Sequence, residues 1–396
     1  MSLFFLIFVI LIIHFSFFLQ LYITGSNQIS FFGWISEFNY SNEIADKCLI
    51  YITLCTIALC IGYMIKRKSN KSKRLTYYDD LNPIRTAKLR YLFRLTCIFQ
   101  ILIVLYVVII GRANYALMTK IRESLNFFFE LRIFPLLIFT YLLQYINRQT
   151  YKKYKIEICL FCLLCLLFVF VQARSLLVEV GCIIGYYFLK QNKNQIKIKY
   201  IVTIYIISII PNIIVLGRLS AEQADLANIE TWKNIFTYEY TILFNSILGE
   251  TIGYTKEFLY GKTVFDGFYM LIPSFLRNML GLIPDKTIIS SIAKDAGVFG
   301  GGFSLFAEMY LNFGWFSVVL FFLMGYFLAL QDNKWFNKSH ITLLACTIPL
   351  IYSYVILGMR NDMAVLVKQI FQIYIVLYIV KILLKIKIFK HEINIR

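Results

Sequence analysis

Long, nearly uninterrupted apolar runs dominate this chain of 396 residues and restrict its possible folds more than any other feature. A helix needs about 20 apolar residues to cross a hydrocarbon layer roughly 30 Å thick, whereas the strands of a membrane barrel show segments of about ten alternating residues. The runs predict an all-α polytopic integral membrane protein with about ten transmembrane helices. Each boundary is defined to within several residues. The expected spans are 2–23, 47–65, 95–111, 133–147, 156–173, 175–189, 200–216, 303–330, 341–357 and 363–381.

Composition excludes the main alternatives to a membrane protein. Charged residues make up 16% of the chain and hydrophobic residues 59%, whereas a water-soluble globule carries about 25% charged residues. Intrinsic disorder, a collagen-like fibre, a secreted disulfide scaffold and a soluble enzyme are therefore excluded. The first apolar run lacks the basic n-region and the cleavage site of a signal peptide, so we expect it to be a retained span.

The unequal distribution of basic residues predicts the orientation of the spans. Loops after the even-numbered spans carry most of the 40 Lys and Arg residues, and cytoplasmic loops are the basic ones in membrane proteins. We therefore expect both termini in the cytoplasm, with the loops after the odd-numbered spans on the outer side of the membrane. The net charge of +18 is accordingly a topology signal and does not indicate a nucleic acid partner. The basic segments are 66–94, 148–155, 190–199, 332–340 and the tail from Lys381.

The sequence predicts no cofactor and no metal site. It contains no Walker sequence, no G-x-G-x-x-G and no H-E-x-x-H, so nucleotide-driven work and zinc hydrolysis are disfavoured. The spacing Cys159-x-x-Cys162-x-x-Cys165 is metal-like, but it lies within a span and has no nearby histidine. A small apolar helix face is the favoured interpretation of these cysteines.

Three parts of the chain follow from the pattern of spans. Residues 1–216 form an N-terminal transmembrane bundle of about seven spans, and residues 303–396 form a C-terminal bundle of about three spans with a basic cytoplasmic tail. Residues 217–302 form one large loop on the outer side. Loops of this length are usually functional. Its apolar pieces, broken by proline and glycine, predict short helices on or within the outer leaflet.

The first unusual feature is the number of arginines on the predicted outer side, which contrasts with the inner loops, where lysine is the more frequent basic residue. For Arg112 and Arg132 we favour snorkelling of the side chain to the membrane interface. Arg174 and Arg360 occupy very short outer turns, where a guanidinium needs an anion, and its planar fork suits a phosphate or pyrophosphate. The outer arginines are Arg112, Arg132, Arg174, Arg218, Arg277 and Arg360.

The second unusual feature is a glycine run, Gly300 to Gly302, that leads into the span beginning at 303. Ser304, Glu308 and Asn312 follow at helical spacing and form one polar stripe. A carboxylate inside a span is costly and indicates function, and glycines at a helix N-terminus allow an anion to approach backbone N–H groups. A structural salt bridge between Glu308 and one of the arginines is the alternative. For Glu179, five residues after Arg174, structural pairing is favoured.

The stretch 300–315, GGGFSLFAEMYLNFGW, resembles a motif of the Wzy-type O-antigen and capsular polysaccharide polymerases that reads roughly G-x-S-x-x-x-E-x-Y-x-N-F-G. The plan of ten or more spans with a large outer loop in the C-terminal half is also similar, and Arg360-Asn-Asp resembles the arginine turn that follows two spans later. The matching positions are Gly302, Ser304, Glu308, Tyr310, Asn312, Phe313 and Gly314.

The resemblance implies a glycosyltransferase reaction without metal or cofactor. A growing glycan on undecaprenyl pyrophosphate is transferred to a new lipid-linked repeat unit, so donor and acceptor are both undecaprenyl-pyrophosphate-linked glycans. The resemblance also implies a bacterial inner (cytoplasmic) membrane protein whose active face is the periplasmic one. Membrane lipids are partners, and a chain-length regulator is a further candidate partner. The implied cation set for the pyrophosphate and its developing charge is Arg174, Arg218, Arg277 and Arg360.

The same resemblance suggests roles for the motif residues. Glu308 is the first candidate for the general base that deprotonates the acceptor hydroxyl, and Asp295 and Glu250 are the second-choice candidates. Histidine is disfavoured as the base, because His14 lies within a span and the other two histidines are on the cytoplasmic side. The residues expected to contact or orient the sugars and lipid phosphate are Gly301, Gly302, Ser304, Tyr310 and Asn312.

Two other functions compete with the polymerase. A lipid-linked oligosaccharide flippase or other transporter would show two similar halves and charged residues near the midplane of several spans. An O-antigen ligase shares the general plan, but ligases resemble one another in a periplasmic histidine of the large loop. No histidine occurs between residues 15 and 339, which ranks the ligase lower.

Overall fold

A computed structural model describes most of the chain. The residues described are 2–24, 28–31, 34–67, 83–111, 117, 120–121, 124–146, 149–170, 175–191, 240–255, 257–272, 274–282, 287–296, 303–337, 341–359 and 363–386. The chain forms two compact units, and each is assembled from stretches that are far apart in the sequence. The first contains Met1–Ser69, Gln195–Asp332 and Val355–Lys368, and the second contains Asn70–Asn194, Asn333–Tyr354 and Gln369–Arg396.

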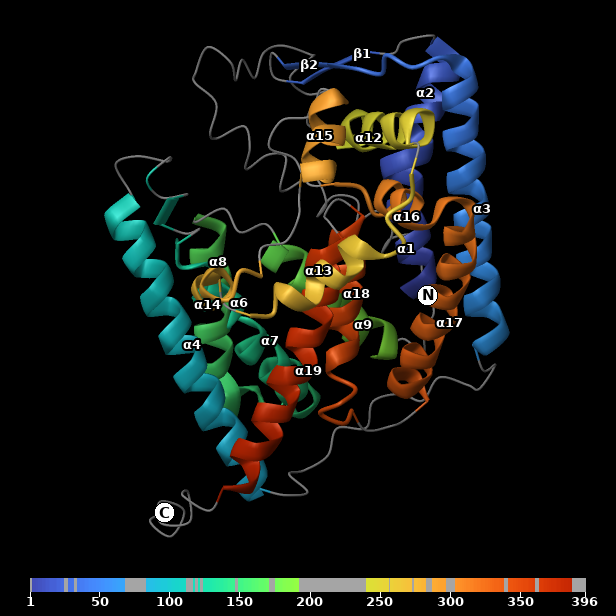
Figure 1. Ribbon diagram of the computed structural model, residues 1–396. Coiled ribbons are helices and arrows are strands. Elements are labelled where there is room, and N and C mark those ends of the chain that lie inside the picture. Colours follow the sequence, from blue (N-terminus) through green and yellow to red (C-terminus); the bar gives the residue numbers. More distant parts are fainter. Residues whose placement is uncertain are drawn as a thin grey trace, which may run out of the picture. The chain divides into compact units, whose positions relative to one another are not determined.

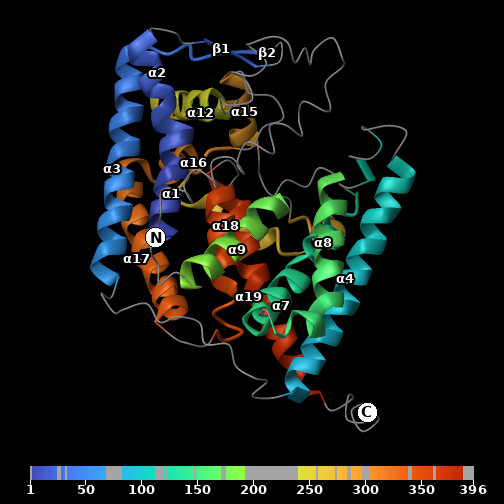
Figure 2. The same cartoon turned by 180° about the vertical axis from the view of Figure 1, so that it is seen from behind.

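The first unit combines the N-terminal helices with helices of the segment predicted as the large loop. Within it, α12 lies against α2, α3 and β2 (Figures 1 and 2). Its elements are α1 (Ser2–Ile10), the π-helical segment η1 (Leu11–Phe15), α2 (Ser16–Thr24), β1 (Gln28–Phe31), β2 (Trp34–Glu37), α3 (Asn42–Lys66), α12 (Tyr240–Tyr254), α13 (Lys262–Tyr269), α14 (Ser274–Met279), α15 (Thr287–Asp295), α16 (Leu305–Phe313), the short 3-10 turn η4 (Gly314–Phe316) and most of α17 (Ser317–Phe336).

The prediction of a helical membrane protein is confirmed, and one small sheet is added to it. Strands β1 and β2 pair antiparallel in the register Gln28 with Glu37 and Phe31 with Trp34. Only two residues, Phe32 and Gly33, separate the strands in the sequence. Such short connections are the usual ones between the strands of a hairpin.

Helix α3 shows how local sequence fixes an element of the first unit. Its N-cap is Ser41, whose side-chain oxygen accepts a hydrogen bond from the backbone N–H of Ile44 at 3.4 Å. Glu43 in the first turn and Lys66 in the last turn complement the helix dipole. Along its length α3 approaches α17 very closely, because a Cβ on Gly325 would lie 2.1 Å from the backbone oxygen of Leu59. Only glycine permits this contact.

The second unit is built around α4. Its elements are α4 (Pro83–Gly111), α6 (Asn126–Glu130), α7 (Ile133–Leu142), the 3-10 turns η2 (Leu143–Tyr145) and η3 (Tyr151–Tyr154), α8 (Lys155–Phe170), α9 (Ser175–Gln191), the end of α17, and most of α18 (Thr347–Gly358) and α19 (Met363–Lys385). Helix α4 begins with Pro83, which suits a first turn because the missing N–H would have no partner there.

Side-chain contacts fix the directions of α7 and α8 relative to α4. The Gln100 side chain donates to the backbone oxygen of Phe128, while Phe93, earlier in α4, stacks on Phe139, later in the chain. Helix α7 therefore runs antiparallel to α4.

Helix α8 runs in the same direction as α4. Glu157, near the start of α8, forms ion pairs with two arginines in the first half of α4. Its Oε1 lies 2.9 Å from Arg90 Nε and 2.7 Å from Arg94 Nη2, and its side chain is fully buried. The first residues of α4 and of α8 consequently lie at the same end of the second unit.

Five helical stretches among the described residues are long and apolar enough to cross a membrane. They are Asn42–Lys66, Ile84–Ile110, Phe127–Tyr145, Leu305–Phe336 and Met363–Lys385, and each overlaps one predicted span. Four further predicted spans coincide with shorter or interrupted helices, namely α1 to α2, α8, α9 and α18. The span predicted at 200–216 lies outside the described residues. The total of ten spans and the division at 216 and 302 therefore stay predictions.

Candidate functional site

The polar stripe predicted on the span beginning at 303 lies on α16, in the interior of the first unit. The side chains of Ser304, Glu308 and Asn312 have no exposed surface, and Ser304 is the N-cap residue of the helix. The neighbouring apolar side chains of α16 are buried as well, so the helix is enclosed on all sides. Three polar groups in such a place need specific partners, because a buried polar group without one is costly.

Glu308 connects α16 to the beginning of α19. Its Oε2 accepts a hydrogen bond from the backbone N–H of Met363, the first residue of α19. Four backbone N–H groups have no partner within the helix at such an end, and the positive end of the helix dipole favours a carboxylate there. The Glu308 carboxylate thus lies at the N-terminus of α19, and the first residue of that helix, Met363, follows Arg360 by three positions in the chain.

Asn312 connects α16 to α13. Its side-chain nitrogen donates to Thr263 Oγ1 at 2.7 Å and to the backbone oxygen of Glu308 at 2.8 Å. Two further hydrogen bonds run from the chain before α13 to the end of α16, from Leu259 N to Leu311 O at 3.0 Å and from Tyr260 N to Asn312 O at 2.9 Å. These bonds satisfy carbonyls that the end of α16 leaves open.

Gly314 explains why α16 stops after nine residues. It has φ of +55°, and a Cβ at this position would lie 2.7 Å from Cζ of Phe258. A side chain is excluded both by the backbone conformation and by this ring. The chain continues through η4 into α17, so the predicted span is a short polar helix followed by a long apolar one.

Tyr310 lies on α16 within an aromatic cluster. Its ring centroid is 5.2 Å from that of Tyr51, 6.0 Å from Phe258 and 6.0 Å from Trp315. The Tyr51 hydroxyl lies 2.7 Å from Ser317 Oγ and donates to the backbone oxygen of Phe306. The cluster therefore fixes Tyr310 and the body of α16 in position.

The two second-choice candidates for the general base, Glu250 and Asp295, lie on α12 and α15, which pack against each other. Glu250 of α12 receives a hydrogen bond from the Tyr40 hydroxyl at 3.0 Å. Burial raises the pKa of the Glu250 carboxyl above its usual value, the charge of Asp295 on α15 adds to the rise, and the Tyr40 hydrogen bond opposes it.

Of the four arginines predicted to bind the pyrophosphate, Arg277 is among the residues that the structure describes. Arg277 lies on α14, and its Nε is buried and makes no hydrogen bond to any residue that the structure describes. Arg174, Arg218 and Arg360 lie outside the described residues, as do Gly301 and Gly302. Their predicted roles stay predictions.

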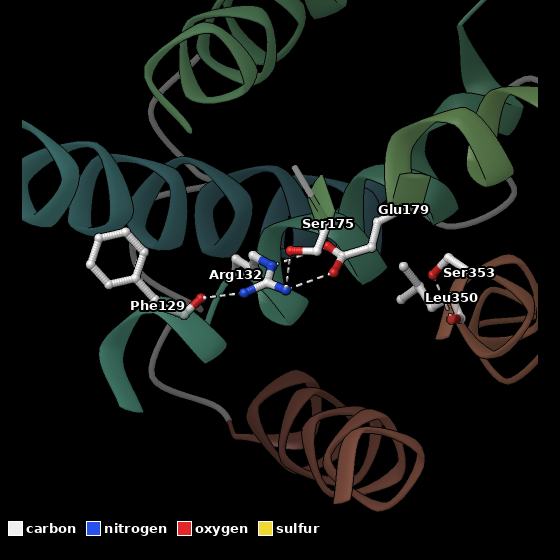
Figure 3. Close-up of polar contacts among 6 residues, drawn as sticks. All are labelled: Phe129, Arg132, Ser175, Glu179, Leu350 and Ser353. Carbon is white, nitrogen blue, oxygen red and sulfur yellow. Dashed lines mark hydrogen bonds and ion pairs between the residues drawn. The ribbon is translucent and has the colours of Figure 1, made fainter. Parts of the chain in front are cut away.

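A buried ion pair in the second unit corrects the interpretation of Arg132. Arg132 at the start of α7 donates to Glu179 of α9 through Nη2 at 2.7 Å and Nε at 3.1 Å, and its Nη2 also donates to Ser175 Oγ at 3.1 Å (Figure 3). The arginine is 8% exposed and the glutamate is not exposed at all. Snorkelling was therefore the wrong interpretation of Arg132, because the guanidinium turns inward to the buried carboxylate of Glu179.

The same pair answers the question about Glu179. Structural pairing is confirmed, with Arg132 as the partner found, while Arg174 lies directly before Ser175 and outside the described residues. One signal in the sequence pointed to this pair. Glu179 is one of very few carboxylates within the spans, and such a group needs a cation from a neighbouring helix.

Fold and site together define a multi-pass helical membrane protein in which a short buried helix carries a carboxylate, an amide and a hydroxyl. A family model described as O-antigen polysaccharide polymerase Wzy matches residues 1–392, and the chain belongs to this family. The match confirms the resemblance that the motif at 300–315 suggested. Comparisons with curated proteins and with solved structures found no match.

Proposed function

We propose that this protein polymerises undecaprenyl-pyrophosphate-linked oligosaccharide repeat units into O-antigen polysaccharide. It would transfer the growing glycan from its lipid pyrophosphate to a hydroxyl of the next lipid-linked unit. The observation that carries this proposal is the family match over almost the entire chain. The competing flippase and ligase functions have no comparable support.

The proposed location is the bacterial inner membrane, with both termini in the cytoplasm and the reaction on the periplasmic face. The directions of α4 and α8 support this orientation. Both helices follow basic segments of the sequence, 66–82 and 148–154, and both begin at the same end of the second unit. Two basic segments on one side are what the positive-inside rule requires.

In the proposed reaction Glu308 accepts the proton of the attacking hydroxyl. Its burial removes it from competing water, and it accepts a hydrogen bond from Met363, which follows Arg360 by three positions in the chain. Arg174, Arg218, Arg277 and Arg360 would bind the pyrophosphate and neutralise the charge that develops as the lipid leaves. Ser304, Tyr310 and Asn312 would orient the sugars, and Gly301 and Gly302 would allow the substrate to approach backbone N–H groups. The proposed reaction uses no metal and no cofactor.

The test uses the purified full-length protein in lipid nanodiscs with the lipid-linked repeat unit of its host. The proposal predicts one molecule of lipid pyrophosphate released for each linkage formed, with unchanged rates in the presence of EDTA. Polymer formation without release of lipid pyrophosphate would overturn the proposed donor, and loss of activity in EDTA that returns with added metal would overturn metal independence.

Glu308→Gln tests the proposed base without removing its contact to α19. The amide oxygen of glutamine can still accept the hydrogen bond from Met363 N–H, so the fold should be retained. General bases contribute roughly 10²–10⁴-fold, and kcat should fall by about that factor at an unchanged melting temperature. Glu43→Gln, at an exposed position of α3, is the matched control. A wild-type kcat for Glu308→Gln would remove Glu308 from this role.

A further inference from the structure

The end of the second unit at which α4 and α8 begin carries an excess of positive charge. Residues 83–94 contain four basic residues and residues 149–158 contain three, and Glu157 is the one acidic residue in these two stretches. The positive end of the helix dipole disfavours cations in the first turns of a helix, so such a cluster favours the binding of an anion. The basic residues are Arg85, Lys88, Arg90, Arg94, Lys152, Lys153 and Lys155.

Glu157 brings two of the arginines to one point. Its Oε1 lies 2.9 Å from Arg90 Nε and 2.7 Å from Arg94 Nη2, and the glutamate side chain is fully buried. A single carboxylate therefore orients both guanidinium groups but compensates only one positive charge. The second charge is accessible from the surface, since 21% of the Arg90 side chain and 35% of the Arg94 side chain are exposed.

Tyr154 brings Lys153 to the same two arginines. The Arg90 guanidinium lies 5.0 Å from the centroid of the Tyr154 ring, and Lys153 Nζ lies 5.9 Å from it. Arg90 Nη2 also donates to the backbone oxygen of Lys153 at 2.7 Å. Tyr154 is buried and Lys153 is exposed. The buried side chains of Glu157 and Tyr154 thus hold Arg90, Arg94 and Lys153 together as a three-cation cluster.

The end of α19 lies at the same end of the second unit. Lys88 Nζ donates to the backbone oxygens of Ile386 at 2.9 Å and Leu384 at 3.4 Å, so the last turn of α19 lies beside the first turns of α4 (Figures 1 and 2). Lys385, between these two residues in the chain, is exposed and adds a further cation. Helix α19 contains no acidic residue that would neutralise it.

Exposed apolar side chains lie directly beside these cations in the chain. Ile84 before Arg85 is 53% exposed, and Ile156 after Lys155 is 54% exposed. A small anion in water gains nothing from such neighbours, whereas a phospholipid brings an anionic headgroup and hydrocarbon chains together. Basic groups at the cytoplasmic ends of membrane helices attract anionic lipids in this way.

We propose that the three-cation cluster binds the phosphate of one anionic phospholipid, whose acyl chains lie along the exposed apolar faces of α4 and α8. A guanidinium group donates two parallel N–H bonds to a phosphate, and the lysine adds a further positive charge. A phospholipid with a choline headgroup fits less well, because its own cation meets the cluster. The site lies in the second unit and does not depend on the proposed reaction.

The measurement is the Kd of the first bound phospholipid, from native mass spectrometry of the purified full-length protein titrated with phosphatidylglycerol or with phosphatidylcholine of the same acyl chains. The Kd for phosphatidylglycerol should be about tenfold lower than that for phosphatidylcholine. Arg94→Gln should raise the Kd for phosphatidylglycerol about tenfold, because it removes charged hydrogen bonds and leaves Arg90 with Glu157. Lys153→Gln should raise it about fivefold.

Two further variants separate a built site from a general attraction between charges. Arg94→Lys keeps the charge but loses the planar fork, and it should raise the Kd about threefold or more. Lys47→Gln on α3 removes an exposed lysine of the first unit and should leave the Kd within about twofold of the wild-type value. Melting temperatures in detergent alone show whether each variant is folded. Since Lys153 is exposed, Lys153→Gln tests the site even where Arg94→Gln does not fold.

Any of four results would overturn the proposal. Equal Kd values for the two phospholipids would show that the headgroup charge is not recognised. Wild-type Kd values for Arg94→Gln and Lys153→Gln would place the bound lipid elsewhere on the protein. A wild-type Kd for Arg94→Lys would reduce the site to a general attraction between charges. Displacement of phosphatidylglycerol by an excess of glycerol 3-phosphate would make a soluble anion the ligand.

Discussion

Breaking the ion pair between Arg132 and Glu179 should destabilise the second unit strongly. Glu179→Gln keeps the size of the side chain but leaves the guanidinium of Arg132, 8% exposed, without the carboxylate that it contacts directly. Removing one partner of a buried pair costs about 3–5 kcal/mol. At about 2–4 °C per kcal/mol for a unit of this size, the melting temperature should fall by roughly 6–20 °C.

A double-substitution cycle makes this prediction specific to the pair. Replacing a buried pair by apolar side chains of similar volume is often neutral, so Arg132→Met with Glu179→Leu should melt close to the wild type. The control is the exposed pair of Lys47 and Glu43 on α3, where Glu43→Gln should not shift the melting temperature measurably. The measurement is thermal unfolding of the full-length protein in nanodiscs.

Two results would refute the reasoning. A shift of less than about 2 °C for Glu179→Gln would show that water or another group compensates Arg132 as well as the carboxylate does. If the melting temperature of the double variant fell by the sum of the two single shifts, the two side chains would not be coupled.

Two further predictions concern close packing and a buried acid. Gly325→Ala should lower the melting temperature clearly, because its Cβ would lie 2.1 Å from the backbone oxygen of Leu59. The control is Gly181→Ala on α9, where an added Cβ would meet nothing within 4 Å, and it should be neutral or stabilising. Equal effects of the two substitutions would contradict the close approach of α3 and α17. Glu250 has a raised pKa in the folded state, so the stability it contributes is present below its ordinary pKa of 4.5 and is lost as the pH rises through the folded value. Glu250→Gln should therefore melt higher than the wild type at neutral pH and equally at pH values below 4.5, and a difference that does not change with pH would show that the charge of Glu250 is not its cause.

The positions of the long apolar helices could be predicted from the sequence, because each needs only a continuous run of about 20 apolar residues. The position of Ser304, Glu308 and Asn312 on one helix also followed from their spacing alone. Local pattern determines such features, and no knowledge of distant partners is required.

Partners from distant parts of the chain could not be predicted in the same way. Arg132 meets Glu179 across 47 positions, and His14 meets Asn245 across 231. An arginine near a helix end has the same local sequence whether it turns toward the membrane interface or inward to a carboxylate. The irregular turn at His14 has no proline or glycine to mark it, because the segment reads Leu-Ile-Ile-His-Phe.

The central claim, that this chain polymerises O-antigen, is tested most directly by a chromosomal deletion in the native host with lipopolysaccharide resolved on a gel. The account predicts that the ladder of long chains collapses to core plus one repeat unit and that the wild-type gene restores it. Complete loss of O-antigen would contradict the account and would point to a flippase or a ligase.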